Sequence, residues 1–274
     1  MRVYVTVDIE GIAGVVHGEE GSPGNAEYER ARRLMTAEAS AVVAGIFDAE
    51  PESAVTVVDV HGPYRNIIPE ELDERATLSR GKPRMYGMVH GIDRGYDAAM
   101  FIGVHGRAGT GQSVISHTFT GTILDVRING VPMGELGLNA AVAGAYGVPV
   151  LLVAGDQTVM TEARDLFGDE QIVVQVKESF AQLSAESLHP REAQRRLRAA
   201  AARAVRERPN VVPLRVETPV TCEVELARPA LADLAEMIDG AERVDGRTVR
   251  YVRNDMPAMY KVLRLITVLC SSPL

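Results

Sequence analysis

The chain is poor in cysteine and in aromatic side chains, and it contains no tryptophan. Only two cysteines occur in 274 residues, and 5% of the residues are aromatic. A disulfide framework or a thiolate metal site would call for more, so Cys222 and Cys270, each in an apolar segment, are expected to be buried thiols. Any metal must therefore be held by nitrogen and oxygen atoms.

The chain also lacks a long apolar run and an excess of basic residues. The first apolar segment stops at Asp8 after a few residues, and the last one, from Val262 to Cys270, is broken by Arg264. Neither segment suits a signal sequence or a membrane span. The formal net charge of -8 disfavours nucleic acid and anionic membranes as partners. A soluble cytoplasmic protein with neither partner is expected.

What the chain does contain is a series of apolar strands that alternate with helical patterns, and at 46% its hydrophobic fraction can supply an adequate core. The expected strands are 3–7, 54–60, 98–104, 148–154 and 171–176, and the expected helices are 25–49, 136–146 and one from about 158. A hairpin is expected where 123–128 and 131–134 flank Asn129-Gly130. The alternation predicts an α/β fold with a mixed, largely parallel sheet flanked by helices.

The pattern changes after Lys177, which predicts two domains. Residues 1–177 would form the metal-binding catalytic α/β domain, and residues 178–274 a smaller α+β domain for packing and oligomerisation. Its expected elements are helices 190–208, 231–238 and 256–269 and strands 220–226 and 247–252. Helix 190–208 is rich in arginine but also contains acids, so a solvated face or a subunit contact is favoured over an anion site.

Three of the expected strands end on side chains that can bind a metal. Asp8 and Glu10 follow the first strand, His61 the second and His105 the third. Alternation along the first strand places both carboxylates on one face, where a divalent cation or a shared proton would relieve their repulsion. The alternative is a pair of solvated acids.

The two histidines favour the metal. Ligands of α/β sheets usually bind at the carboxyl ends of the strands, and imidazole together with carboxylate suits Zn²⁺ better than Mg²⁺ or Ca²⁺. Asp59 could accept a hydrogen bond from an imidazole of this site, or it could be an ordinary acid at the end of a strand.

Two further residues are candidates for the same site. Glu135 lies between Gly134 and Gly137 where a helix is expected to start, and it could instead complement the helix dipole. His117, after the glycine-rich segment 106–113, could transfer a proton or stabilise an oxyanion, or be a plain loop histidine. The glycine-rich segment lacks the spacing of a phosphate-binding or dinucleotide-binding loop and is interpreted as a loop of the site.

With these residues in view, the sequence resembles the zinc-dependent D-aminopeptidase family associated with bacterial dipeptide-transport operons. The matching words lie in order across the first half of the chain and continue to residue 156, and the long one at 134–140 is the most specific. They are VDIEGIAG (7–14), YER (28–30), MTAEA (35–39), DVH (59–61), GVH (103–105), SH (116–117), GELGLNA (134–140), PVL (149–151) and VAGD (153–156).

The resemblance implies two zinc ions in each subunit. Asp8 would bridge them, Glu10 and His105 would complete one site, and His61 and Glu135 the other. His117 would be the catalytic residue beside the metals. The family also implies a homo-oligomer, a ring-shaped decamer that admits only short peptides.

The predicted function is therefore a metallo-aminopeptidase that removes an N-terminal residue, with D-alanine expected, by hydroxide formed from a water between the metals. His117 could act as acid or base, oxyanion donor or nucleophile. Two alternatives stay open: a binuclear-zinc amidase or L-aminopeptidase acting on other small amides, and a metal-dependent peptide-binding protein without catalysis.

Overall fold

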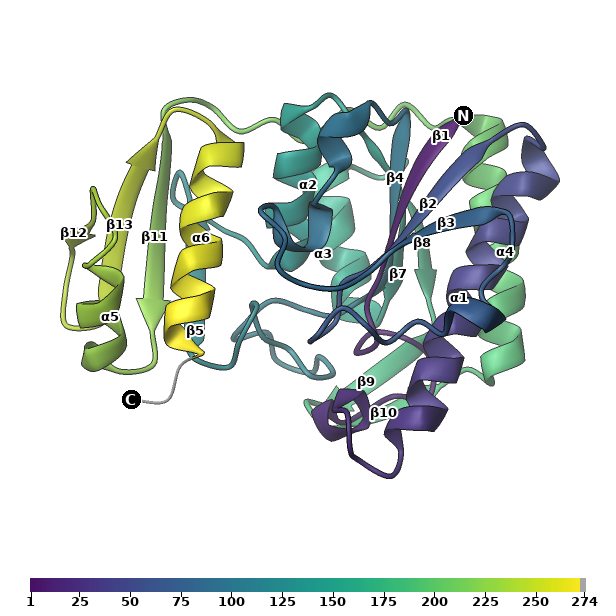
Figure 1. Cartoon of the computed structure of the whole chain (residues 1–274), viewed down its shortest axis with the longest axis horizontal. Helices are drawn as coiled ribbons and strands as arrows, with labels where there is room; N and C mark the ends of the chain where they lie inside the picture. The colour runs from purple at the N-terminus through teal and green to yellow at the C-terminus, as the bar shows by residue number, and fades with distance from the viewer. Residues whose placement is uncertain (272–274) are drawn as a thin grey trace.

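A six-stranded parallel sheet forms the centre of the fold in the computed structural model, which describes residues 1–271 (Figure 1). The strand order is β3-β2-β1-β4-β7-β8, and every neighbouring pair is parallel. The strands are β1 (Arg2–Val7), β2 (Ala54–Asp59), β3 (Ala76–Ser79), β4 (Ala98–Val104), β7 (Val150–Gly155) and β8 (Ile172–Gln175). The predicted α/β class with a largely parallel sheet is confirmed.

Helices cover both faces of this sheet. On one face, α1 (Tyr28–Ala49) and α4 (Pro190–Glu207) pack against each other, and on the other lie α2 (Glu135–Ala145) and α3 (Gln157–Phe167). Within β1, Val3, Val5 and Val7 join the core beneath α1 and α4, and Tyr4 joins the opposite core. Both faces are buried, which explains why the strands read as nearly continuous apolar runs.

A second sheet is antiparallel and has the order β12-β13-β11-β5-β6. Its elements are β5 (Ile123–Ile128), β6 (Val131–Pro132), β11 (Val220–Leu226), β12 (Glu242–Arg243), β13 (Thr248–Arg253), α5 (Pro229–Ala235) and α6 (Met256–Cys270). Helix α6 lies between this sheet and α2 (Figure 1).

The division between the two sheets does not coincide with the predicted boundary after residue 177. Strand β5 comes from before that position and pairs with β11 from after it. Conversely, α4 from after it packs on α1 in the first half. The sequence patterns marked most of the longer elements but carried no information about these long-range pairings.

Several short elements were not predicted. A two-stranded sheet joins β9 (Lys177–Ala181) to β10 (Ser184–Ser187), and single turns of 3₁₀ helix occur at η1 (Gly18–Gly21), η2 (Pro69–Glu71), η3 (Gly87–Val89) and η4 (Ile92–Arg94). Of these, the sequence indicates only the turn at Pro69, because proline at a first helical position followed by two acids suits a short helix. Polar, half-exposed segments such as β9 and β10 have no apolar periodicity to reveal them.

The remaining structural expectations can be compared directly. Cys222 and Cys270 are free and buried, as predicted. The arginines of α4 form surface ion pairs, including Arg196 with Glu192 and Arg198 with Asp48, which agrees with a solvated face. Within residues 1–271, no helix combines the length and the apolar character that crossing a membrane requires.

Candidate metal centre

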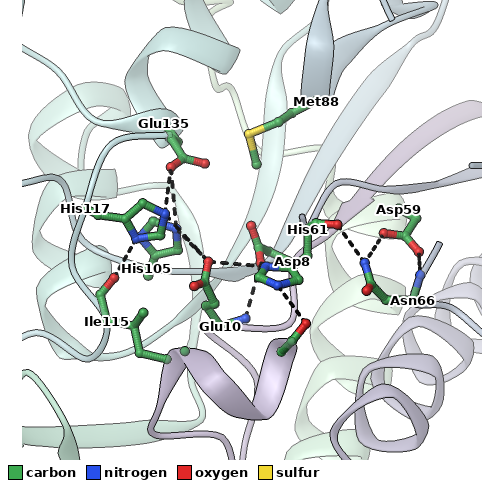
Figure 2. Close-up of polar contacts among 12 residues, drawn as sticks. Asp8, Glu10, Asp59, His61, Asn66, Met88, His105, Ile115, His117 and Glu135 are labelled. Atoms are coloured by element: carbon green, nitrogen blue, oxygen red, sulfur yellow. Dashed lines mark hydrogen bonds and ion pairs between the residues drawn. The ribbon is translucent and has the colours of Figure 1, made fainter. Parts of the chain in front are cut away.

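The candidate residues meet at the carboxyl edge of the parallel sheet. Strands β2 and β4 flank β1 in parallel register, so Asp8, His61 and His105 come from three adjacent strand ends. Glu10 follows two residues after Asp8, and Glu135 is the first residue of α2. His117 comes from the loop between β4 and β5. Figure 2 shows all six side chains directed toward one point.

Two glycines permit this close approach. A Cβ atom on Gly103 would lie 2.1 Å from the carbonyl oxygen of Asp8, and its φ of +70° is unfavourable for other residues. A Cβ atom on Gly21 would lie 2.6 Å from Nε2 of His61. Any larger side chain at either position would push a candidate ligand away.

The polar atoms of the site lie within a few ångströms of one another. Nδ1 of His61 is 3.2 Å from Oδ1 of Asp8 and 3.3 Å from Oε2 of Glu10. Nε2 of His105 is 3.6 Å from carboxylate oxygens of both Glu10 and Glu135. These are four carboxylate and imidazole contacts in a region where Asp8, Glu10, His105 and Glu135 are all buried.

Each imidazole has one nitrogen next to a backbone carbonyl. Nε2 of His61 faces the oxygen of Gly21 at 3.2 Å, and Nδ1 of His105 faces that of Gly106 at 3.1 Å. A carbonyl oxygen only accepts, so the facing nitrogen must carry the proton and donate. The other nitrogen of each ring therefore faces carboxylate oxygens. Its lone pair would point at their negative charge unless the nitrogen is protonated or a cation lies between the nitrogen and the oxygens. Carbonyl-anchored imidazoles are the usual arrangement around zinc.

The charges of the cluster shift its pKa values. Burial opposes ionisation of Glu10, yet the hydrogen bond from His61 and the nearby charges of His117 and His105 lower its pKa to about 2. Burial likewise opposes the charged form of His105, but the carboxylates of Glu135, Glu10 and Asp8 raise its pKa to about 9. The carboxylates thus favour a positive charge in front of them, which a divalent cation would supply while displacing the protons.

The geometry offers three groups of side chains whose ligand atoms lie within 4.8 Å of one another. Asp8, Glu10 and His105 each belong to two of the groups. The groups are Asp8, Glu10 and His61; Asp8, His105 and Glu135; and Glu10, His105 and His117. The donor set of carboxylates and imidazoles fits zinc. The structure places His61 beside Glu10, whereas its implied partnership with Glu135 stays a prediction.

His117 differs from the other imidazoles in its exposure. Its side chain is 22% exposed, against 2% for His105, on which its ring stacks with 4.3 Å between centroids. Nδ1 of His117 donates to the oxygen of Ile115 at 2.8 Å. Nε2 is thereby left facing Glu10 and Glu135 at 3.8 Å. This nitrogen can reach both the metal cluster and a molecule in the cavity.

That cavity has a volume of about 340 Å³, at the lower end of the range for small-molecule sites. Its lining residues come from the strand ends, from loops and from the last helix. They are Asp8, Glu10, Val60, His61, Gly62, Tyr64, Lys82, Met88, His117, Phe119, Glu135, Arg264, Thr267, Val268 and Ser271.

Asp59 does not accept a hydrogen bond from an imidazole of the site. It is fully buried and binds the backbone N–H groups of Asn66 and Ile67 and the side chain of Asn66. Asn66 in turn donates to the carbonyl oxygen of His61 at 2.7 Å (Figure 2). Asp59 therefore organises the loop after β2, and the proposed contact with an imidazole was wrong.

The glycine-rich segment is a loop of the site, as predicted. The carbonyl of Gly106 accepts the bond from His105, and Ser113 binds the buried carboxylate of Asp156. His17 and His189 have structural roles, since each accepts a hydrogen bond from a backbone N–H group at the start of η1 or α4.

Two buried charged residues behind the site were missed. Nζ of Lys177 donates to the carbonyl oxygens of Glu10 and Val15, at 2.6 and 2.7 Å, and so ties down both ends of the loop after β1. Oε1 of Glu38 accepts from the N–H of Ala13 in the same loop at 2.9 Å. A signal existed for Glu38, since it lies within the buried stripe of α1 next to Ala39. No periodicity marks Lys177.

Burial raises the pKa of Glu38 to about 7, against 4.5 for an ordinary glutamate. The folded state therefore holds this proton more tightly than the unfolded state, and stability falls as the pH rises from 4.5 to 7. We expect Glu38→Gln, which keeps the acceptor for Ala13, to stabilise the protein by up to about 3 kcal/mol above pH 7 and to change little at pH 4. Urea unfolding at both pH values measures this, with exposed Glu52→Gln as control. Equal gains at both pH values would contradict it.

Comparisons with known proteins find D-aminopeptidases that match nearly the whole chain. A sequence model described as D-aminopeptidase matches residues 1–265. The D-aminopeptidase of Bacillus subtilis (strain 168) is 35% identical over 270 residues, which are 98% of this chain and 97% of that protein. The solved structure of the Zn-dependent D-aminopeptidase DppA from Bacillus subtilis, described as a self-compartmentalizing protease, superposes with a TM-score of 0.95. Its identity is 34%, and the match covers 100% of this chain and 99% of that one.

Proposed function

Since this chain belongs to the D-aminopeptidase family, we propose that it is a zinc-dependent aminopeptidase that removes an N-terminal residue, D-alanine in particular, from short peptides. The observation that carries the proposal is the convergence of three buried carboxylates and three imidazoles on one point beside a small cavity. The family predicted from the sequence motifs is confirmed.

Asp8, Glu10, His61, His105 and Glu135 would hold two zinc ions, with Asp8 shared between them. Zinc at such a site lowers the pKa of a water molecule and polarises a carbonyl group. The protein contributes orientation: Phe119 N–H donates to Oε1 of Glu135 at 2.7 Å, and Glu10 N–H lies 3.2 Å from Oδ1 of Asp8. Both carboxylates are thus fixed by the backbone before a ligand arrives.

His117 is the residue proposed to act on the substrate. Because its Nδ1–H is held by Ile115, Nε2 is the atom that can hydrogen-bond a developing oxyanion or pass a proton to the leaving amine. The ring stacked on His105 keeps Nε2 in place. The cavity of about 340 Å³ suits a di- or tripeptide rather than a folded protein.

We further propose a homo-oligomer in the form of a ring-shaped decamer. Its support is the similarity to a relative described as a self-compartmentalizing protease. Residues 178–274 would contribute to packing and subunit contacts. A native mass equal to a single 29.6 kDa chain, measured by analytical ultracentrifugation, would contradict this arrangement.

The function is tested by metal analysis together with matched D-alanyl and L-alanyl di- and tripeptides. We expect bound zinc, cleavage of the D-alanyl peptides, loss of at least about 99% of activity after complete chelation, and recovery when zinc is returned. Hydrolysis that survives complete removal of zinc would contradict the mechanism. Full zinc occupancy with cleavage of neither series would favour a peptide-binding protein.

A further inference from the structure

The cavity carries two positive side chains in addition to the metal-binding cluster. Lys82 comes from the loop after β3, and Arg264 comes from the middle of α6. Neither belongs to the elements that supply the candidate metal ligands. The cavity therefore combines the acidic cluster at the sheet edge with two basic side chains, Lys82 and Arg264, from other elements of the fold.

These two cations lack a partner of opposite charge. Within residues 1–271, no carboxylate lies at ion-pair distance from either, and Nε of Arg264 is buried without a hydrogen-bond partner. Burial and the charges of Arg264 and Arg84 lower the pKa of Lys82, so Lys82 lies close to two other positive charges. A buried donor without a partner, such as Nε of Arg264, costs free energy unless a ligand satisfies it, whereas Lys82 is exposed to solvent.

Aromatic rings hold both cations at the cavity. Nζ of Lys82 lies 4.6 Å from the centre of the Tyr64 ring, and the guanidinium of Arg264 lies 5.9 Å from that of Phe119. Both rings also line the cavity. A cation against an aromatic face is stabilised but keeps N–H groups free to donate. The two side chains are thus positioned to donate hydrogen bonds to an anion in the cavity.

We propose that Arg264 and Lys82 bind the C-terminal carboxylate of the peptide substrate, so that the enzyme selects short peptides with a free carboxylate over amides and longer chains. This inference rests on the proposed peptidase function. A residue spans at most about 3.6 Å, so in a small cavity the C-terminus of a di- or tripeptide lies close to its scissile bond. Guanidinium and ammonium groups are the natural partners of that carboxylate.

The test compares D-alanyl-D-alanine with its C-terminal amide, in which a neutral carboxamide of similar size replaces the carboxylate. Wild-type enzyme should prefer the free acid. Arg264→Gln and Lys82→Gln should each lower kcat/KM for the acid by about 10- to 100-fold, mainly through KM, because a charge-assisted hydrogen bond is lost. For the amide the loss should be at least about tenfold smaller. Arg264→Lys, which retains the charge, should recover part of the preference.

The control is Lys261→Gln, which removes a cation one turn earlier on α6, outside the cavity lining, and should leave both substrates unaffected. Zinc content and melting temperature of each variant report on folding independently of activity. Equal losses on acid and amide, or no preference in the wild type, would overturn the carboxylate proposal alone. Wild-type enzyme that cleaves neither substrate would instead contradict the peptidase function. Should Arg264→Gln fail to fold, Lys82→Gln and Arg264→Lys still decide the question.

Discussion

Replacing His117 with alanine is expected to lower kcat by about one hundred to ten thousand times while the zinc content stays unchanged. The geometry explains why activity should be lost while zinc is retained. His117 is the most exposed imidazole of the cluster, and its Nε2 lies 3.8 Å from Glu10 and Glu135, farther than any contact of His61. Losing it removes a group that can reach the substrate, whereas five stronger candidates remain to hold the metals.

The measurement is steady-state hydrolysis of D-alanyl-D-alanine together with elemental analysis of the same preparation. His90→Ala serves as a matched control, because His90 is a half-buried histidine that does not line the cavity. A His117→Ala enzyme at the full rate would refute the catalytic role. If the variant instead lost zinc, His117 would be a ligand, as its group with Glu10 and His105 allows.

Asp8→Ala is expected to abolish both zinc binding and turnover. Asp8 is the ligand proposed to be shared by the two zinc ions, so its loss would weaken both proposed metal positions at once. Wild-type protein should gain about 2.7 kcal/mol of stability per site at zinc concentrations 100 times the dissociation constant, which raises the melting temperature by several degrees. In Asp8→Ala this zinc-dependent rise should disappear.

Differential scanning calorimetry with and without zinc measures the effect, and elemental analysis confirms the occupancy. Asp125→Ala is the control, since this carboxylate pairs with Arg127 on β5, outside the cluster. Should Asp8→Ala retain two zinc ions per chain, the bridging role would be refuted. Retention of one ion would indicate that Asp8 serves a single position.

The sequence was sufficient to locate the cluster because of a property of parallel sheets. Adjacent strands end at the same edge, so a carboxylate or imidazole directly after an apolar run has a predictable position. Asp8, His61 and His105 were found in this way. Glu135 and His117 come from a helix start and a loop, where their local sequence made them candidates, and the family motifs implied their roles as zinc ligand and catalytic residue.

Other parts of the site could not be predicted, because they depend on contacts between distant segments. Lys177 reaches Glu10 across 167 positions of sequence, and Asp59 turned toward Asn66 rather than toward an imidazole. The place of Arg264 in the cavity depends on α6 packing between the second sheet and α2. Periodicity reports which face of an element is buried, but it does not report the partner.

The pairing of β5 with β11 also sets an order in which the molecule can form during synthesis. All six strands of the parallel sheet and all proposed zinc ligands lie before residue 176, whereas the partner of β5 begins at Val220. Because a chain emerges from its N-terminus, we expect the zinc ligands to assemble while β5 still has an open edge. The nascent chain would then be able to bind metal before Arg264 emerges, and its exposed strand would be prone to aggregation until the last hundred residues follow.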